Sequence, residues 1–162
     1  MKNLKSNIIL TLITLIVFGA LYPLAMTSLG SLISSCGAEG KPIYKEDKLI
    51  GYENVGQAFY SDSYFWSRPS AVDYDGSSTG GSNYGNQSPE LLKAIKERSQ
   101  KLMEHNPGLA KSEIPVELIT ASGSGLDPHI SKKAALLQAN RISKVRNIAK
   151  EDLVNLIDRH NE

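Results

Sequence analysis

The densest cluster of residues that could do chemistry lies in one glycine-rich loop, which reads SGSGLDPH from Ser122 to His129. A phosphate-binding P-loop needs GxxxxGK followed by Ser or Thr, and no lysine follows these glycines at the required place. A serine nucleophile elbow needs GxSxG, but Ser122 stands where the first glycine is required. Asp127 and His129 flank Pro128 too closely to align as the orienting acid and base of a catalytic triad. We therefore favour a tight structural turn over a ligand site, because glycine adopts positive φ readily.

Other reactive side chains are scattered along the chain. His105, His129 and His160 lie far apart, and Cys36 is the only cysteine, so we predict no metal site and no internal disulfide. Arg68 lies in the motif WSRPSA, where a guanidinium beside an aromatic ring can pack on that ring or clamp a carboxylate. The sequence favours the first role for Arg68 only slightly over a contact with a partner.

These residues must be positioned by the rest of the chain, whose first 36 residues differ from the remainder in charge and apolar content. No charged residue occurs from Ser6 to Ala38, a run of 33 positions. A membrane-spanning helix needs about 20 apolar residues, and Lys2 and Lys5 before the run favour a cytoplasmic N-terminus. We expect a cytoplasmic N-terminus (1–7), a transmembrane helix (8–28), a juxtamembrane segment (29–47) and an extracytoplasmic soluble domain (48–162) of a single-pass protein in the cell membrane.

Within the expected span, Pro23 predicts a kink near residues 19–22, because proline removes one backbone donor and crowds the preceding turn. Gly19 and Ala20 would allow another helix to approach closely, although an isolated anchor explains them equally well. The apolar run is longer than that of a cleaved signal peptide. A lipoprotein signal ending at Cys36 is an alternative, and the sequence leaves open whether Cys36 is modified.

The sequence after the apolar run, which we call the body, predicts an α+β fold: one soluble α/β-type domain with short strands and about three helices. Without Lys2 and Lys5 the body holds 16 basic and 17 acidic residues, a net charge of −1, which excludes nucleic-acid binding. We expect short strands in residues 48–59 broken at Gly51 and Gly56, and a strand at 114–120. Helices are expected at 89–105, after Ser131, and at 152–160, with a polar loop at 75–87. The second helix should bury Ala135, Ala139, Ile142 and Val145 and expose Lys133, Arg141 and Lys144.

Taken in order, several segments resemble the C subunit (KdpC) of the bacterial Kdp potassium-transporting P-type ATPase. They are Tyr22 to Leu24 in the span, FWSRPSA from Phe65, GGSNYG from Gly80, IPVELITASGSGLDPHI from Ile114, and the basic helix through Arg141 and Arg146. The resemblance covers nearly the whole chain, and the block from Ile114 to Ile130 is specific.

The resemblance implies a non-catalytic accessory subunit of a complex that uses ATP to import potassium. Its partners would be a channel-like A subunit, a P-type ATPase B subunit that uses the ATP, a small F subunit, and membrane lipid. In that family the C subunit is described as a catalytic chaperone that raises the ATP affinity of the B subunit, with a glycine-rich stretch proposed to contact nucleotide. A body outside the cell could not reach cytoplasmic ATP, so we expect a stabilising cap on the A subunit.

The candidate partner-contacting or loop-shaping residues are Arg68, Pro69, Ser70, Gly80, Gly81, Ser82, Asn83, Ser122, Gly123, Ser124, Gly125, Asp127 and His129, with Gly19, Ala20 and Pro23 as packing residues in the span. The competing class is a membrane-anchored exported hydrolase or ligand-binding lipoprotein that would use Ser122 or Ser124 with His129.

Overall fold

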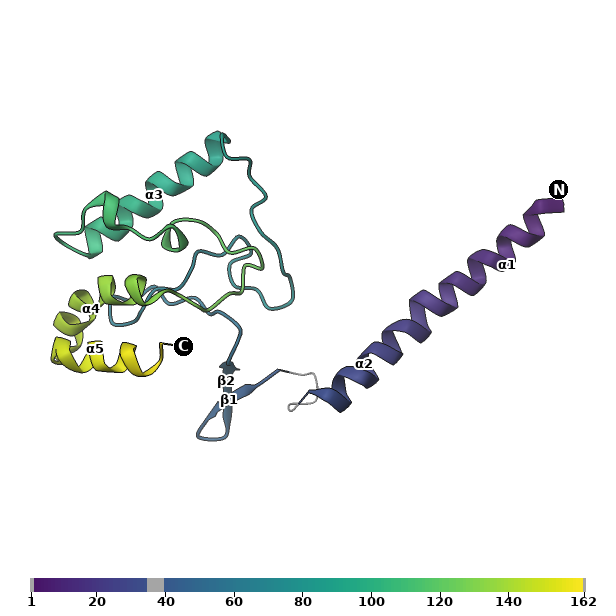
Figure 1. Cartoon of the computed structure of the whole chain (residues 1–162), viewed down its shortest axis with the longest axis horizontal. Coiled ribbons are helices and arrows are strands. Elements are labelled where there is room, and N and C mark those ends of the chain that lie inside the picture. The colour runs from purple at the N-terminus through teal and green to yellow at the C-terminus, as the bar shows by residue number, and fades with distance from the viewer. Residues whose placement is uncertain (1, 35–39, 162) are drawn as a thin grey trace. The chain divides into compact units, whose positions relative to one another are not determined.

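The structure is a computed structural model and describes residues 2–34 and 40–161. The chain divides into two compact units, Met1–Glu53 and Asn54–Glu162. The first unit holds a long apolar helix and a two-stranded sheet, and the second holds three α-helices connected by long irregular segments (Figure 1). The predicted α+β class is confirmed.

A continuous apolar helix forms the N-terminal part of the first unit. It comprises α1 (Lys2–Ile16), the π-helical turn η1 (Val17–Leu21) and α2 (Tyr22–Ile33). Within the 31 residues from Asn3 to Ile33, an 18-residue window reaches a mean hydropathy of 2.4, and none of that window is buried within the chain. A helix of this length and composition is sufficient to cross a bilayer, and it extends beyond the predicted span on both sides.

The irregularity in this helix lies where Pro23 predicts one. In η1 the Tyr22 amide donates to the Val17 carbonyl, five residues back, and Pro23 follows in the first turn of α2. Proline has no amide hydrogen to donate to the preceding turn. The π turn accommodates this because its backbone hydrogen bonds join residues five apart instead of four. The Thr27 hydroxyl then donates to the Pro23 carbonyl at 2.8 Å.

The sheet is an antiparallel hairpin of β1 (Pro42–Lys45) and β2 (Lys48–Tyr52). Its turn residues, Glu46 and Asp47, adopt φ values of 49° and 61°, which are typical of a two-residue hairpin turn. The strand predicted at the start of 48–59 is confirmed, but Gly51 lies inside it and does not break it. The pairing shifts register between Ile43 and Tyr44, whose partners Gly51 and Leu49 flank Ile50.

No strand continues over residues 55–59, so that part of the prediction is wrong. The Gly56 amide donates to the Leu126 carbonyl at 2.6 Å, so the backbone there pairs with a loop of the body. A Cβ on Gly56 would lie 3.0 Å from the Leu126 carbonyl oxygen, so only glycine fits without a shift. The residue that suggested a strand break is instead a point of close backbone approach.

The second unit is built on α3 (Pro89–His105), α4 (Lys132–Arg146) and α5 (Lys150–Arg159). The first two begin after serine caps, since the Ser88 hydroxyl accepts from the Leu91 amide at 3.2 Å and the Ser131 hydroxyl from the Ala134 amide at 3.1 Å. In Figure 1, α4 and α5 run side by side in opposite directions. All three predicted helices are confirmed.

The strand predicted at 114–120 is wrong. The 3₁₀ turn η2 (Lys111–Glu113) precedes this segment, and within it residues form a second 3₁₀ turn, η3 (Val116–Leu118), directly after Pro115. The Val116 carbonyl accepts from both the amide and the hydroxyl of Thr120, each at 2.9 Å. Ile114 and Leu118 are both buried, and their spacing of four is that of a helical turn, which outweighs the β-branched composition.

The three helices share one core, with α4 in its middle. Ala134 of α4 joins Trp66, Leu102, Ile114 and Leu118 in one cluster. A second stripe of α4 (Ala135, Ala139 and Ile142) packs against Leu153 and Ile157 of α5. The predicted stripe is therefore confirmed except for Val145, which is exposed. Trp66 and Phe65, from the aromatic first half of the body, thus pack with aliphatic residues from its second half.

The prediction that Arg141 faces water is wrong, because only 5% of its surface is exposed. Its Nη1 donates to the Asp62 carbonyl at 2.8 Å, its Nη2 to the Tyr64 carbonyl at 3.1 Å, and its guanidinium carbon lies 4.5 Å from the Trp66 ring centroid. One turn earlier, Gln138 accepts from the Trp66 amide at 2.8 Å and donates to the Trp66 carbonyl at 3.1 Å. Two side chains of α4 thus satisfy the backbone of a segment that has no secondary structure of its own.

Replacing Arg141 by alanine should lower the free energy of unfolding by about 3 kcal/mol, because several buried acceptors would lose their donor at once. The measurement is urea unfolding of the full-length chain in detergent, followed by the fluorescence of Trp66, the single tryptophan. The control Arg146→Ala changes an exposed arginine of the same helix and should stay within about 0.5 kcal/mol. Equal stabilities for the two variants would contradict the role of Arg141.

Candidate functional site

Three loops that carry the predicted site residues meet in the second unit. They are residues 68–74, 80–83 and 122–129, which we call the three-loop junction. The Ser122 amide donates to the Pro69 carbonyl at 3.0 Å, and the Gly80 amide donates to the Ser124 carbonyl at 2.9 Å. The structure therefore brings together residues that lie more than forty positions apart in the sequence.

An ion pair between Arg68 and Asp127 holds the junction on one side. Arg68 Nη1 donates to Asp127 Oδ2 at 2.7 Å, and both side chains are about three-quarters buried, with 27% and 28% exposed. Of the roles predicted for Arg68, the structure shows the carboxylate clamp, while Arg141 is the arginine on Trp66. The buried Arg68 Nε has no hydrogen-bond partner among the described residues.

Asp127 uses its other oxygen to cap the turn that contains Pro128. Oδ1 accepts from the backbone amide and from Nδ1 of His129, each at 3.0 Å. Burial raises the pKa of Asp127, but these hydrogen bonds and the adjacent Arg68 guanidinium outweigh it and hold the pKa below its ordinary value. The carboxylate thus stays charged at neutral pH and links Arg68 to the turn.

Ser70 and Tyr74 fix the first loop of the junction. The Ser70 hydroxyl accepts from the amides of Val72 and Tyr74 at 3.1 and 2.9 Å, and the Tyr74 hydroxyl donates to the Arg68 carbonyl at 2.6 Å. Burial is the largest influence on the Tyr74 hydroxyl and raises its pKa, which keeps this donor protonated. Sequence reasoning missed Tyr74, although a lone tyrosine with an Asp on either side of it was visible.

The glycines of the junction are required where backbones nearly touch. Gly125 has φ of +73°, and a Cβ there would lie 2.5 Å from Val72 Cγ2 and 2.9 Å from the Gly80 carbonyl oxygen. A Cβ on Gly81 would lie 3.2 Å from the Gly123 carbonyl oxygen, whereas Gly123 itself has open space around it. Ser82 is half-buried, and Asn83 is exposed in the left-handed conformation with φ of 52°. The expected tight turn is confirmed at Gly125.

The serines proposed for a hydrolase do not contact the histidine. Ser122 is buried, with 2% exposed, and the Ser124 hydroxyl accepts from the Leu126 amide at 3.1 Å. Asp127 and His129 do hydrogen-bond to each other, contrary to the sequence argument about their spacing, because the turn at Pro128 folds the two side chains together. Among the described residues no serine hydroxyl is bonded to His129, so the geometry supplies an acid–histidine pair without a nucleophile.

Other predicted site residues lie outside this junction. Gly19, Ala20 and Pro23 belong to the apolar helix of the first unit, and a Cβ on Gly19 would meet nothing within 4 Å. Within residues 2–34 and 40–161, no group of three or more His, Cys, Asp or Glu side chains is arranged to hold a metal ion. The lipidation hypothesis concerns Cys36, which lies outside the described residues.

Residues 4–162 of the chain match one protein family, KdpC, described as the c chain of a K⁺-transporting ATPase. The chain belongs to this family. Among its relatives, the potassium-transporting ATPase KdpC subunit of Flavobacterium johnsoniae is 43% identical over 158 residues, which are 98% of this chain and 86% of that protein. The KdpC subunit of Caldanaerobacter subterraneus subsp. tengcongensis is 40% identical over 161 residues, covering 99% of this chain and 83% of that subunit. The KdpC subunit of Serratia proteamaculans is 41% identical over 161 residues, 98% of this chain and 85% of that subunit.

The KdpC resemblance inferred from the sequence is therefore confirmed over nearly the whole chain. It places the junction within the matched region. The family match leaves the role of each junction residue as a prediction, and the geometry assigns these residues first to holding three loops in one arrangement.

Gly125→Ala should destabilise the second unit by about 2 kcal/mol or more, because the added methyl would overlap Val72 and strain a left-handed backbone. Gly123→Ala is the matched control, since its Cβ would meet nothing within 4 Å, and it should change stability by less than about 0.5 kcal/mol. Denaturant unfolding of the full-length protein in detergent compares the two. A neutral Gly125→Ala variant would mean that the loops separate easily.

Proposed function

We propose that this KdpC-family chain is a non-catalytic accessory subunit that stabilises an ATP-driven potassium import complex from outside the cell. The match to the c chain of a K⁺-transporting ATPase across residues 4–162 is the observation that supports this most strongly. The apolar helix would anchor the chain beside its partners, and the second unit would dock as a cap. The partners would be the channel-like A subunit, the P-type ATPase B subunit and the small F subunit.

The orientation of the chain decides between this cap and a direct role in nucleotide binding. Lys2 and Lys5 precede the uncharged run that begins at Ser6, and the positive end of a span stays in the cytoplasm. With that orientation the second unit is separated from cytoplasmic ATP by the bilayer. An effect on the ATP affinity of the B subunit would then pass through the assembled complex, and ATP would not contact this chain.

The junction suits a docking role because its geometry is fixed before any partner arrives. Its loops are joined by backbone hydrogen bonds and by the Arg68–Asp127 ion pair, so little conformational entropy would be lost on binding. Asn83 and His129 are exposed at its surface, where a partner could reach them. We propose that these loops contribute to the surface that faces the A subunit.

Affinity purification of the tagged chain from solubilised membranes tests the function directly. We expect a large P-type ATPase and a channel-like subunit to co-purify. Gly19→Leu should lower the yield of these partners several-fold by blocking close helix approach, whereas Thr14→Leu, which adds apolar bulk on another face of the helix, should not. A chain recovered alone would contradict the proposal, and equal yields for both variants would remove Gly19 from the packing surface.

Cysteine labelling in intact cells tests the orientation. In a Cys36→Ser background, Gln87→Cys lies before α3 in the second unit and Asn3→Cys lies at the start of α1, and both positions are exposed. A membrane-impermeant maleimide should label position 87 and leave position 3 unlabelled until the cells are opened. The reverse pattern would put the second unit in the cytoplasm and favour a nucleotide role.

A further inference from the structure

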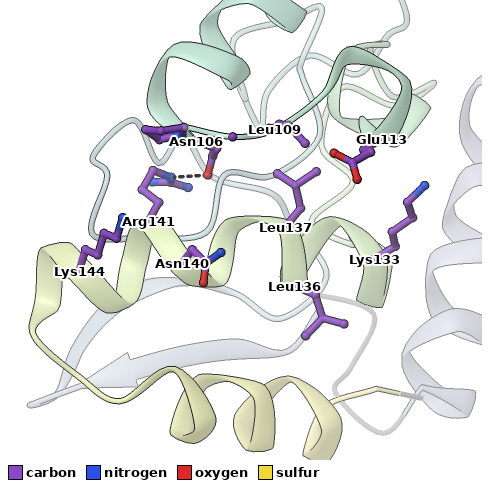
Figure 2. A pocket seen from close by; sticks show the side chains of 11 residues that line it. Asn106, Leu109, Glu113, Lys133, Leu136, Leu137, Asn140, Arg141 and Lys144 are labelled. Atoms are coloured by element: carbon purple, nitrogen blue, oxygen red, sulfur yellow. Dashed lines mark hydrogen bonds between the residues drawn. The ribbon is translucent and has the colours of Figure 1, made fainter.

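The third face of α4 lines a groove that the core and the junction do not use. One stripe of α4 packs in the core, a second holds Gln138 and Arg141, and a third carries Lys133, Leu137, Asn140 and Lys144 at spacings of four, three and four. The loop after α3, from Asn106 to Leu109, forms the opposite wall. The groove has a volume of about 440 Å³ and is open to solvent (Figure 2).

The floor of the groove is apolar and its ends are basic. Figure 2 shows Leu137 pointing toward Leu109 in the middle, with Lys133 at one end and Lys144 at the other. The two lysines are eleven residues apart on one helix, which separates them by about 16 Å along its axis. Their neighbour on α4, Lys132, pairs with Asp158 at 2.8 Å and does not line the groove.

The charges along the groove are mostly unneutralised. Within the described part of the chain, no carboxylate lies within 4 Å of the Lys133 or Lys144 ammonium, and the side-chain amide of Asn140 has no hydrogen-bond partner. Glu113 is the one acid in the lining, and its carboxylate accepts from the Ala110 amide at 3.0 Å. Arg141 at the base is already paired with the Asp62 backbone and carboxylate. Two lysines and an amide are therefore left to face an anionic ligand.

We propose that this groove binds an acidic segment of a partner subunit, with two carboxylates on Lys133 and Lys144 and an apolar side chain between them on Leu137. The proposal rests on the function proposed above and names one surface of the complex. A span of about 16 Å corresponds to about four to six residues of extended chain. Because alternate side chains of an extended chain share one face, acids at positions i and i+4 or i and i+6, with an apolar residue at i+2, would fit. A small anion could reach only one of the two lysines, which is why a peptide segment suits the groove better.

The test reverses both charges and measures assembly. The variant Lys133→Glu/Lys144→Glu, in the full-length tagged chain co-expressed with its partner subunits, should weaken association by about tenfold or more, with dissociation at lower salt than wild type. The control Lys96→Glu/Lys150→Glu makes the same change in net charge at exposed lysines of α3 and α5 outside the groove, and should assemble as wild type does. If the wild-type chain co-purifies and both variants match it, the groove proposal is overturned while the accessory function stands. If the wild-type chain recovers no partner, the accessory function itself fails.

A photocrosslinking residue, p-benzoylphenylalanine, placed at Asn140 identifies what occupies the groove. We expect it to capture a partner segment that contains at least two acidic residues, mapped by mass spectrometry. Capture of a segment without acids would overturn the proposal. Loss of binding to phosphatidylglycerol vesicles in the Lys133→Glu/Lys144→Glu variant, with assembly retained, would assign the lysines to lipid headgroups instead. Trp66 fluorescence unfolding of each variant shows whether a lost assembly reflects a lost fold.

Discussion

The second unit depends on the pairing of α4 with the backbone of residues 62–66. Arg141 and Gln138 together supply hydrogen bonds to the carbonyls of Asp62 and Tyr64 and to both backbone groups of Trp66. Without such partners the free-energy cost of burying this irregular backbone would be too high, since each unpaired buried polar group costs about 1–3 kcal/mol. The two side chains play the part that a neighbouring strand plays in a sheet, and they fix Trp66 where the first hydrophobic cluster needs it. From α3, His105 contacts the Trp66 ring edge-on and hydrogen-bonds to Asp62, so it also helps to hold residues 62–66 in place.

The three-loop junction extends this arrangement by a different means. Its loops pair backbone to backbone, through Pro69 with Ser122 and Gly80 with Ser124, and Gly56 pairs with Leu126 from outside the junction. These hydrogen bonds require two backbones to approach closely. This explains why glycine occurs at contact points and why the loops are poor in apolar residues. Arg68 and Asp127 add one charged link between two of the loops. The glycine-rich composition therefore follows from packing of loops against loops, and a phosphate ligand is not needed to explain it.

The sequence predicted the helices well and the irregular segments poorly. Ser88 and Ser131 mark helix starts through local capping chemistry, which acts within one turn and can be read from a few residues. The strand expected at 114–120 failed because Pro115 and a buried spacing of four favour a helical turn over strand pairing. The burial of Arg141 could not be predicted, because its acceptors lie some eighty positions away in a segment with no periodicity. The site residues were identified by resemblance, while their convergence depends on contacts that only the folded chain reveals.

Helix α4 contributes both to the packed interior of the second unit and to the groove that is open to a partner. Three stripes of α4 face three environments: the apolar core, the polar backbone of residues 62–66, and the open groove. Since Arg141 is paired with Asp62, the unpaired cations that line the groove are Lys133 and Lys144 at its two ends. A partner that docks there would meet a helix already held rigid on its other two faces. Rigid support of this kind lowers the entropy lost on binding, so a groove with only two free cations can still select an acidic segment of matching length.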